Sequence, residues 1–268
     1  MTTPLPDFPG AVGITALRVY PWEAADGLCG GSPHVHLCCS EGYIVVGGAG
    51  RVQTLTYPQP ASSASSAGFH PPPASGFTET PLRPGDVVWF TPGTVHRAVN
   101  DGDLHVVALM QNSGLPESGD AVLTLPPQYL TDPETYRRAI SLAGPGGPSP
   151  DRARARRDLA IEGFTELRKH SEAGDGAALE AFFAAAAALV RPQLAKWRDV
   201  WAQGAAAASR RTGEQIEALA ASDHSHLRQA AVARIEEPPA ATLGMCGHLS
   251  PYDPVRLAGA GTDPRTAR

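Results

Sequence analysis

The chain has 268 residues, of which 28 are glycine and 26 are proline, while charged residues make up only 18%. A hydrophobic content of 42% excludes a chain that is disordered throughout, and the length suffices for one large domain or two modest ones. The formal net charge of −5 provides no basic field that would attract nucleic acid.

Neither the start of the chain nor its apolar runs indicate a membrane protein. The first ten residues lack the basic start and apolar stretch of a secretory signal. The longest apolar run, residues 181–190, is half as long as a membrane-spanning helix. Four cysteines, two of them adjacent at Cys38 and Cys39, do not make a disulfide framework. We therefore expect a cytoplasmic protein with free thiols that contacts no membrane.

Proline and alanine divide the chain into two parts. Residues 1–150 hold 20 of the 26 prolines but only 14 alanines, whereas residues 151–268 hold 29 alanines. Proline interrupts regular structure and alanine is the best helix former, so the first part is expected to be β-rich and the second α-helical. The predicted organisation is a β domain at 1–125, a turn-rich linker at 126–150 and an α-helical region at 151–268.

Short β-branched runs separated by turns fill the first part. The clearest are residues 43–46, 52–56, 86–90 and 104–110. The glycines between the first two runs predict a hairpin, and many short strands of this kind indicate a sandwich or barrel. Residues 57–77 have no periodicity and little apolar surface, which predicts a mobile loop.

Three or four helices are expected in the second part. The clearest segments are residues 153–170, 177–190 and 212–235. Ser149 and the proline after it are a start signal for the first of these helices. Pro192 predicts a break and a restart after the second.

Two segments of the β-rich part carry side chains that can bind a metal ion. In GSPHVHLCCSEGYIVVGG, His34 and His36 are two apart in a predicted strand, so their side chains point to the same face. Glu41 follows after a short stretch that can supply a turn. In GDVVWFTPGTVHRAVN, a Thr-Pro-Gly turn presents His96 at the start of the next strand.

Three imidazoles and one carboxylate are a suitable ligand set for a first-row divalent metal. Burying these groups in a barrel without a metal would be costly, because each needs a partner. Four protein ligands on an octahedral ion leave two positions for substrate, water or dioxygen. We therefore predict one metal site formed by His34, His36, Glu41 and His96.

The same two segments closely resemble the two sequence motifs of the cupin superfamily. The first motif, G-x5-H-x-H-x3–4-E-x6-G, is filled here with a shorter first spacing by Gly31, His34, His36, Glu41 and Gly47 or Gly48. Gly27 or Gly30 is the alternative for its first glycine. The second, G-x5-P-x-G-x2-H-x3-N, is filled by Gly85, Gly93, His96 and Asn100. Thr91 replaces its proline, and Pro92 falls one place later. The resemblance covers roughly residues 15–112 and includes all four ligand positions.

This resemblance implies a double-stranded β-helix, a small jelly-roll barrel with the metal inside, followed by an added helical region that the motifs do not cover. Cupins with these ligands use iron, manganese, nickel, copper or zinc. The stretch between the motifs is long by family standards, and the loop at 57–77 could cover the barrel mouth. The motifs specify a fold and a metal site, but they do not specify a reaction.

The alternation of side chains along strands nominates residues for a substrate pocket beside Glu41 and His96. It nominates Tyr43, Asn100, His105 and Gln111, and Gln53 and Trp89 are further candidates. For His105 and Gln111, the alternative is that their neighbours Val106, Ala108 and Met110 face inward, and the pattern does not decide between the two sets.

We expect a metal-dependent enzyme that acts on a small metabolite. The first expectation is an oxygenase-type reaction, similar to that of quercetin dioxygenase, at one metal ion. The alternatives are an isomerase or cyclase similar to phosphomannose isomerase, and a small-molecule-binding protein without catalysis. No catalytic residue is assigned. The expected partners are a small-molecule substrate and a second copy of the chain in a homodimer, but neither nucleic acid nor a membrane.

Overall fold

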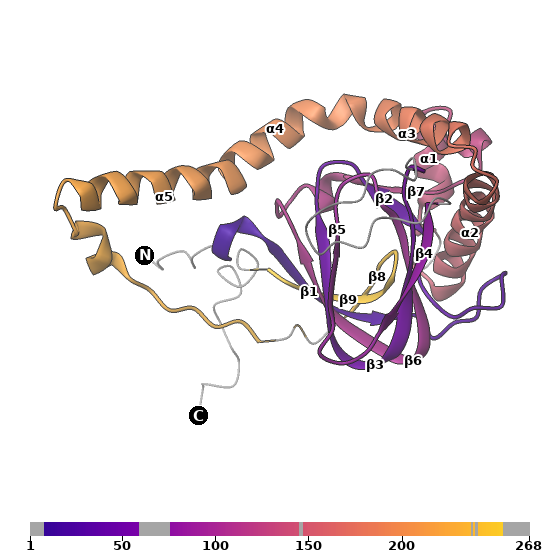
Figure 1. The fold of residues 1–268 in the computed structure, drawn as a ribbon, viewed down its shortest axis with the longest axis horizontal. Coiled ribbons are helices and arrows are strands. Elements are labelled where there is room, and N and C mark those ends of the chain that lie inside the picture. Colours follow the sequence, from indigo (N-terminus) through magenta and orange to yellow (C-terminus); the bar gives the residue numbers. More distant parts are fainter. Residues whose placement is uncertain (1–7, 59–75, 145–146, 237, 239–240, 254–268) are drawn as a thin grey trace.

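A computed structural model describes residues 8–58, 76–144, 147–236, 238 and 241–253. Nine strands form one antiparallel sheet that curls into a barrel, and helices follow it in the chain (Figure 1). The predicted fold class, a β-barrel followed by helices, is confirmed. Most of the predicted loop, residues 59–75, lies outside the described residues.

The strands are β1 (Gly13–Val19), β2 (His34–His36), β3 (Glu41–Leu55), β4 (Phe77–Leu82), β5 (Val87–Phe90), β6 (Val95–Met110), β7 (Ala121–Leu123), β8 (Thr242–Leu243) and β9 (Gly247–Tyr252). The α-helices are α1 (Pro133–Ile140), α2 (Pro150–Glu172), α3 (Ala177–Val190), α4 (Leu194–Gln203) and α5 (Ala205–Ala220). Short 3-10 turns include η1 (Pro9–Ala11) and η4 (Arg191–Gln193).

The two long strands β3 and β6 pair with each other over most of their length. The predicted hairpin at residues 47–50 is wrong, because these glycines form bulges within one continuous strand. Gly48 has φ of +72°, and a Cβ there would lie 2.1 Å from the carbonyl oxygen of Asp103, so this close approach requires glycine. The bulges let β3 pair with β5 in its first half and with β4 in its second.

The sheet separates two apolar cores. Inside the barrel, Tyr43, Val45 and Val106 belong to one cluster of buried side chains. On the outer face, residues such as Val35 and Leu123 pack against α2 and α3, chiefly at Phe164 and Phe182. Val35 lies between His34 and His36 on β2, and neighbouring side chains of a strand point to opposite faces. Val35 therefore faces the helices, and both histidines face the barrel interior.

The observed bounds of α2 and α3 agree with those predicted from the sequence, whereas those of α5 do not. Ser149 caps α2 by accepting a hydrogen bond from the backbone of Arg152, and α3 has the predicted bounds. Pro192 lies in η4, where the break is predicted. α5, however, ends at Ala220, so the helix predicted to continue to residue 235 is wrong there.

Two further segments differ from the expected organisation. The predicted linker at 126–150 contains α1, which Asp132 caps by accepting hydrogen bonds from two backbone N–H groups. Residues 242–252, expected within the helical region, form β8 and β9 instead, and β9 pairs with β1. The chain therefore returns to the barrel after its helices.

By length and composition alone, the helical run Ala177–Ala220 is apolar enough to cross a membrane. A core helix of a water-soluble protein meets the same criterion, so this is weak evidence. The run is also interrupted by η4 and by Gly204, and the short α4 carries Lys196, Arg198 and Asp199.

Candidate metal centre

The first two predicted ligands lie on β2, a strand whose three residues are all buried. β2 pairs with β6 on one side and β7 on the other, and its register sets His34 directly opposite His96. Because His34 and His36 are two residues apart, both imidazoles enter the barrel from the same strand face. The pairing with β6 then brings the third imidazole beside them.

Glu41 is the first residue of β3, and His96 follows a turn between β5 and β6. The turn contains Gly93, with φ of +87°, whose backbone N–H donates to the carbonyl of His36. This bond ties the turn to the histidine strand. Each of the four side chains contributes one potential ligand atom, and these four atoms lie within 4.8 Å of one another. The structure thus brings together all four predicted ligands.

The hydrogen bonds of the three imidazoles leave their Nε2 atoms for a metal. Nδ1 of His34 contacts the carbonyl of Ser32 at 3.0 Å, and Nδ1 of His96 contacts that of Thr94 at 3.1 Å. A carbonyl only accepts, so Nδ1 carries the proton in both rings and Nε2 presents a lone pair. This is the tautomer that a metal site at Nε2 needs.

Two buried atoms at the centre have no hydrogen-bond partner within the described part of the chain. They are Oε2 of Glu41 and Nε2 of His96, which lie only 2.9 Å apart without hydrogen-bond geometry. Nε2 of His36 lies 3.3 Å from the same carboxylate oxygen. Unsatisfied buried acceptors that converge on one point are costly by themselves, and a divalent cation would satisfy them. The donor set therefore fits a first-row metal ion.

Asp120 supports this site, and the sequence motifs do not reveal it. Its Oδ2 accepts from Nδ1 of His36 at 2.9 Å, and its Oδ1 accepts from the backbone N–H of Cys38 at 2.7 Å. Burial lowers the pKa of His36, but its hydrogen bonds with Asp120 and Glu41 outweigh burial and raise that pKa to about 9. The two carboxylates that favour a charged imidazole also favour a bound cation.

Burial acts differently on the other ligands. It holds the pKa of His34 well below its usual range, and the neighbouring His96 and His36 lower it further. For Glu41, burial alone would raise the pKa, but contacts with His36 and His96 hold it well below its ordinary value. A neutral imidazole and an ionised carboxylate are the forms in which these side chains bind metals.

Aromatic side chains form the wall beside His96. The ring of Phe90 stacks on the imidazole at 4.2 Å between centroids, and Tyr43 meets Phe90 edge-on at 5.2 Å. Tyr43 is fully buried, and its hydroxyl lies 3.8 Å from Sγ of Cys246. Burial raises the pKa of this phenol well above its ordinary value, so it stays protonated. Tyr43 is thus placed in the barrel interior, as predicted, whereas Phe90 and Cys246 are not among the predicted residues.

Cys246 reaches the interior because β9 returns to the barrel. The backbone of Cys246 lies so close to Gly31 that a Cβ on that glycine would be 2.4 Å from it. Gly31 is also the residue assigned to the first glycine of the motif. No local spacing signal connects residue 246 to the histidines, since the contact is made by strand pairing over a long separation.

Two of the predicted pocket residues face away from the barrel interior. Trp89 is 57% exposed on the outer surface, while its neighbour Phe90 points inward. Gln53 lies under α2 and donates to Glu79 at 2.8 Å. The bulges in β3 change which residues face inward, so Val52 and not Gln53 belongs to the interior cluster.

The remaining candidates belong to β6 and the segment after it. Asn100 is buried but has a structural role, because it donates to Val19 and accepts from the backbone N–H groups of Gly102 and Leu104. Val106 and Ala108 face the interior, so the alternation along β6 directs His105 outward. Gln111 is exposed and accepts from the backbone N–H of Ser40. Neither of the last two is a pocket residue.

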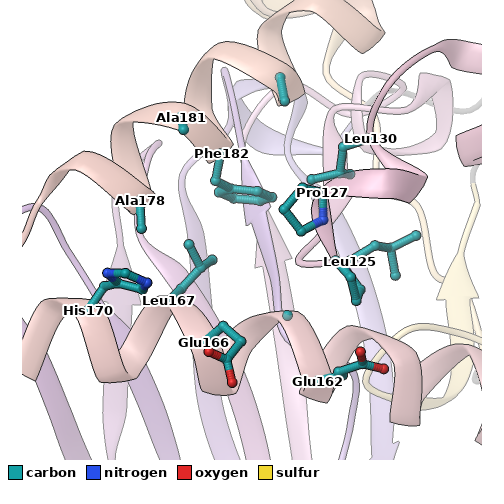
Figure 2. A pocket seen from close by; sticks show the side chains of 13 residues that line it. Leu125, Pro127, Leu130, Glu162, Glu166, Leu167, His170, Ala178, Ala181 and Phe182 are labelled. Carbon is teal, nitrogen blue, oxygen red and sulfur yellow. The ribbon is translucent and has the colours of Figure 1, made fainter.

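A pocket of about 250 Å³ lies outside the barrel, between α2 and α3. Figure 2 shows Phe182 of α3 and Leu167 of α2 pointing into it, with Glu162, Glu166 and His170 along α2. Leu125 and two prolines close its third side. None of the four metal ligands lines this pocket, which is therefore a feature of the helical cover and not of the metal site.

Residues 8–130 match the protein family described as Cupin. This range contains β1 to β7 and all four candidate ligands. No curated protein matches the sequence of the chain.

The barrel is also similar to domains of solved structures. One is an uncharacterised conserved protein with a double-stranded β-helix domain from Klebsiella pneumoniae, at 17% identity over 41% of this chain and 75% of the other, with a TM-score of 0.25. Another is the cupin domain of Drosophila melanogaster CENP-C, at 18% identity over 37% of this chain and 58% of the other, with a TM-score of 0.24. A third is CapF of Staphylococcus aureus, described as a capsular polysaccharide assembling protein. Its identity is 19% over 44% of this chain and 29% of the other, with a TM-score of 0.27. The chain spans less than two thirds of the last two, and none of these likenesses carries a functional argument.

Proposed function

Since the chain carries a domain of the cupin family at residues 8–130, we propose that it is a metal-dependent enzyme that catalyses an oxygenase-type reaction on a small metabolite. The observation that carries this proposal is the convergence of one imidazole nitrogen from each of three histidines and one carboxylate oxygen inside the barrel. Two of these atoms lack any other partner among the described residues. When bound there, a first-row ion would supply Lewis acidity toward substrate oxygens and, as iron, redox chemistry with dioxygen.

The surroundings of the ligands favour an apolar or aromatic substrate over a sugar. The described side chains that face the interior beside His96 include the rings of Phe90 and Tyr43 and the small Ala98. A sugar isomerase needs several polar side chains to bind hydroxyl groups, and this wall offers apolar surface for a flat ring instead. This composition supports an oxygenase reaction similar to that of quercetin dioxygenase over an isomerase or cyclase reaction.

The chain's own residues have separate roles in this proposal. His34, His36, His96 and Glu41 hold the ion, while Asp120 fixes the ring of His36 through Nδ1. Phe90 packs on His96 and restricts its rotation. The low exposure of the four ligands excludes bulk water from the centre, which strengthens electrostatic interactions there.

The test combines metal analysis with oxygen uptake. Purified protein is expected to contain one metal ion per chain and, with iron, to consume oxygen when a phenol, thiol or keto acid substrate is present. His36→Ala and His96→Ala should abolish both metal binding and turnover. The matched control is His105→Ala, a change on the same strand at an outward-facing position, which should retain both.

Three results would overturn the proposal in different ways. Unchanged metal content in His96→Ala would show that the site is misassigned. Turnover of sugars or keto acids with zinc or manganese and without oxygen uptake would establish the isomerase alternative. Tight binding of a small molecule without any product would establish the non-catalytic alternative.

A further inference from the structure

A groove lies between one end of the barrel and the helices that cross it. Figure 1 shows α3 and α4 passing over the end of the barrel at which β2 is labelled. Two hollows of about 320 and 420 Å³ lie there, and Cys38, Leu194 and Trp197 line both of them. Because the hollows share these residues, they form one groove, the α3–α4 groove, and its size suits a small molecule.

The floor of the α3–α4 groove consists of two turns that position metal ligands. Residues 37–38 follow His36 directly, and residues 92–93 belong to the turn that precedes His96. The backbone N–H of Gly93 donates to the carbonyl of His36, so the two turns are tied to each other. A molecule in the groove would therefore rest on a fixed surface of the barrel.

One face of α4 forms the wall of the groove. Its side chains are spaced three, four and seven residues apart, so they share a helix face. They are Leu194, Trp197, Arg198 and Trp201. The ring of Trp197 is held in place, because its Nε1 donates to the carbonyl of Ser118 at 3.0 Å. Trp201 is 52% exposed, and an exposed aromatic ring at a groove is surface that a ligand can cover.

Arg198 makes the groove electropositive. Of the described residues that line the two hollows, it is the one charged side chain. It forms no ion pair with any residue that the structure describes, although the chain as a whole has a net charge of −5. A guanidinium binds carboxylates through its paired N–H donors, and the neighbouring indole rings favour a flat aromatic body.

From the floor, the aromatic wall and this charge, we propose that the α3–α4 groove is a binding site for a small aromatic carboxylate. The ring of the ligand lies against Trp197 and Trp201, and its carboxylate accepts hydrogen bonds from Arg198. The proposal is independent of the reaction at the metal site, because none of the four metal ligands lines the groove.

Cys38 allows a test at a defined position, because this exposed thiol lines both hollows. The probe is 2-naphthoate. At about ten times its dissociation constant, it should slow the alkylation of Cys38 by iodoacetamide about tenfold, since only the free protein then reacts. Cys29 is a partly exposed thiol that does not line the groove, and its alkylation rate should stay unchanged. Mass spectrometry of the two peptides measures both rates.

A neutral probe of the same shape, 2-naphthamide, tests the charge. By calorimetry, 2-naphthamide should bind the wild type about tenfold more weakly than 2-naphthoate does, because it lacks the charged acceptor. Arg198→Gln should reduce the affinity for 2-naphthoate about tenfold and leave the affinity for 2-naphthamide unchanged. The matched control is Arg137→Gln, a change at an exposed arginine of α1, which should alter neither affinity.

The aromatic wall is tested in the same way. Trp201→Ala should weaken the binding of both probes about three- to tenfold, because both lose the ring contact. The matched control is Trp89→Ala, since Trp89 is 57% exposed on the barrel, and it should bind both probes like the wild type. Circular dichroism checks that each variant keeps its fold.

Absence of 2-naphthoate binding up to about 10 mM would overturn the proposal, as would equal protection of Cys38 and Cys29. Wild-type affinity for 2-naphthoate in Arg198→Gln would overturn the assignment of a carboxylate. Protection of Cys38 that rises with protein concentration in the absence of a probe would show that a second copy of the chain covers the groove instead.

Discussion

α2 and α5 are both helices of the alanine-rich part of the chain, but they lie in opposite environments. α2 buries eight of its residues, among them Gly163 and Phe164, whereas α5 buries none. Both occur where alanine is frequent and proline is nearly absent. The comparison shows that composition predicts where a helix forms, while a few specific contacts with the sheet decide whether it joins the core.

The largest difference between the two helices is expected on truncation of an apolar side chain. Phe164→Ala should reduce the free energy of unfolding by about 3–5 kcal/mol, because Phe164 is buried between α2 and the outer face of the sheet. Ile216→Ala should change it by less than about 0.5 kcal/mol, because the side chain is 59% exposed. Denaturant unfolding measures both, and equal losses would show that α5 has a core contact of its own.

Glycine substitutions in the same two helices should have opposite signs. A Cβ on Gly163 would lie 2.1 Å from the carbonyl oxygen of Thr124, so Gly163→Ala should destabilise the fold by about 1–3 kcal/mol. Gly213→Ala meets no neighbour and should stabilise the fold by about 1 kcal/mol. Thermal unfolding of the two variants in parallel checks this contrast, which a stabilising Gly163→Ala would contradict.

A third prediction sharpens the difference between the buried barrel and the exposed end of α5. Asp120→Asn should weaken metal binding about 10–100-fold, since the amide holds His36 less firmly than the carboxylate does. Asp223→Asn, a change just beyond α5, should leave metal affinity unchanged. Competition with a chelator of known affinity measures both. Equal affinity in wild type and Asp120→Asn would remove Asp120 from the support of the site.

The smallest expected effect is the pH dependence of one ion pair, between Asp26 and Arg97 of β6. Burial would raise the pKa of Asp26, but the hydrogen bond and charge of Arg97 outweigh it and hold that pKa below its usual 3.8. Because the folded pKa is lowered, the contribution to stability is present above pH 3.8 and is lost as the pH falls through the folded pKa.

Asp26→Asn should therefore cost about 1 kcal/mol at pH 7 and progressively less in acid. Unfolding measured at several pH values gives the comparison. The control is Glu236→Gln, which removes a fully surface-exposed pair with Arg234 and should have no measurable effect. A cost for Asp26→Asn that stays constant down to pH 2 would contradict the assigned ion pair.

The metal ligands could be predicted from sequence because local geometry places them. His34 and His36 share a strand face by spacing alone, and short turns bring Glu41 and His96 to the ends of neighbouring strands. The pocket residues could not be predicted in the same way. The bulges in β3 shift the alternation, so Gln53 faces α2, and the continuity of β6 turns His105 outward.

The supporting residues Asp120 and Cys246 cannot be predicted from local sequence for a related reason. Asp120 lies 84 positions from His36, and Cys246 lies 203 positions from Tyr43. No short-range pattern encodes such contacts, because they arise when β7 and β9 join the sheet beside strands that are remote in the chain.

The amino-acid sequence by itself determined the division into a β-rich and a helical part, the main helix starts and the identity of the four ligands. These follow from propensity, capping and spacing, which act over a few residues. Only the tertiary structure decided which side chains surround the ligands, that the last strands return to the barrel, and that α2 is buried while α5 projects. Those outcomes depend on strand register and on which surfaces meet, and both are properties of the folded chain as a whole.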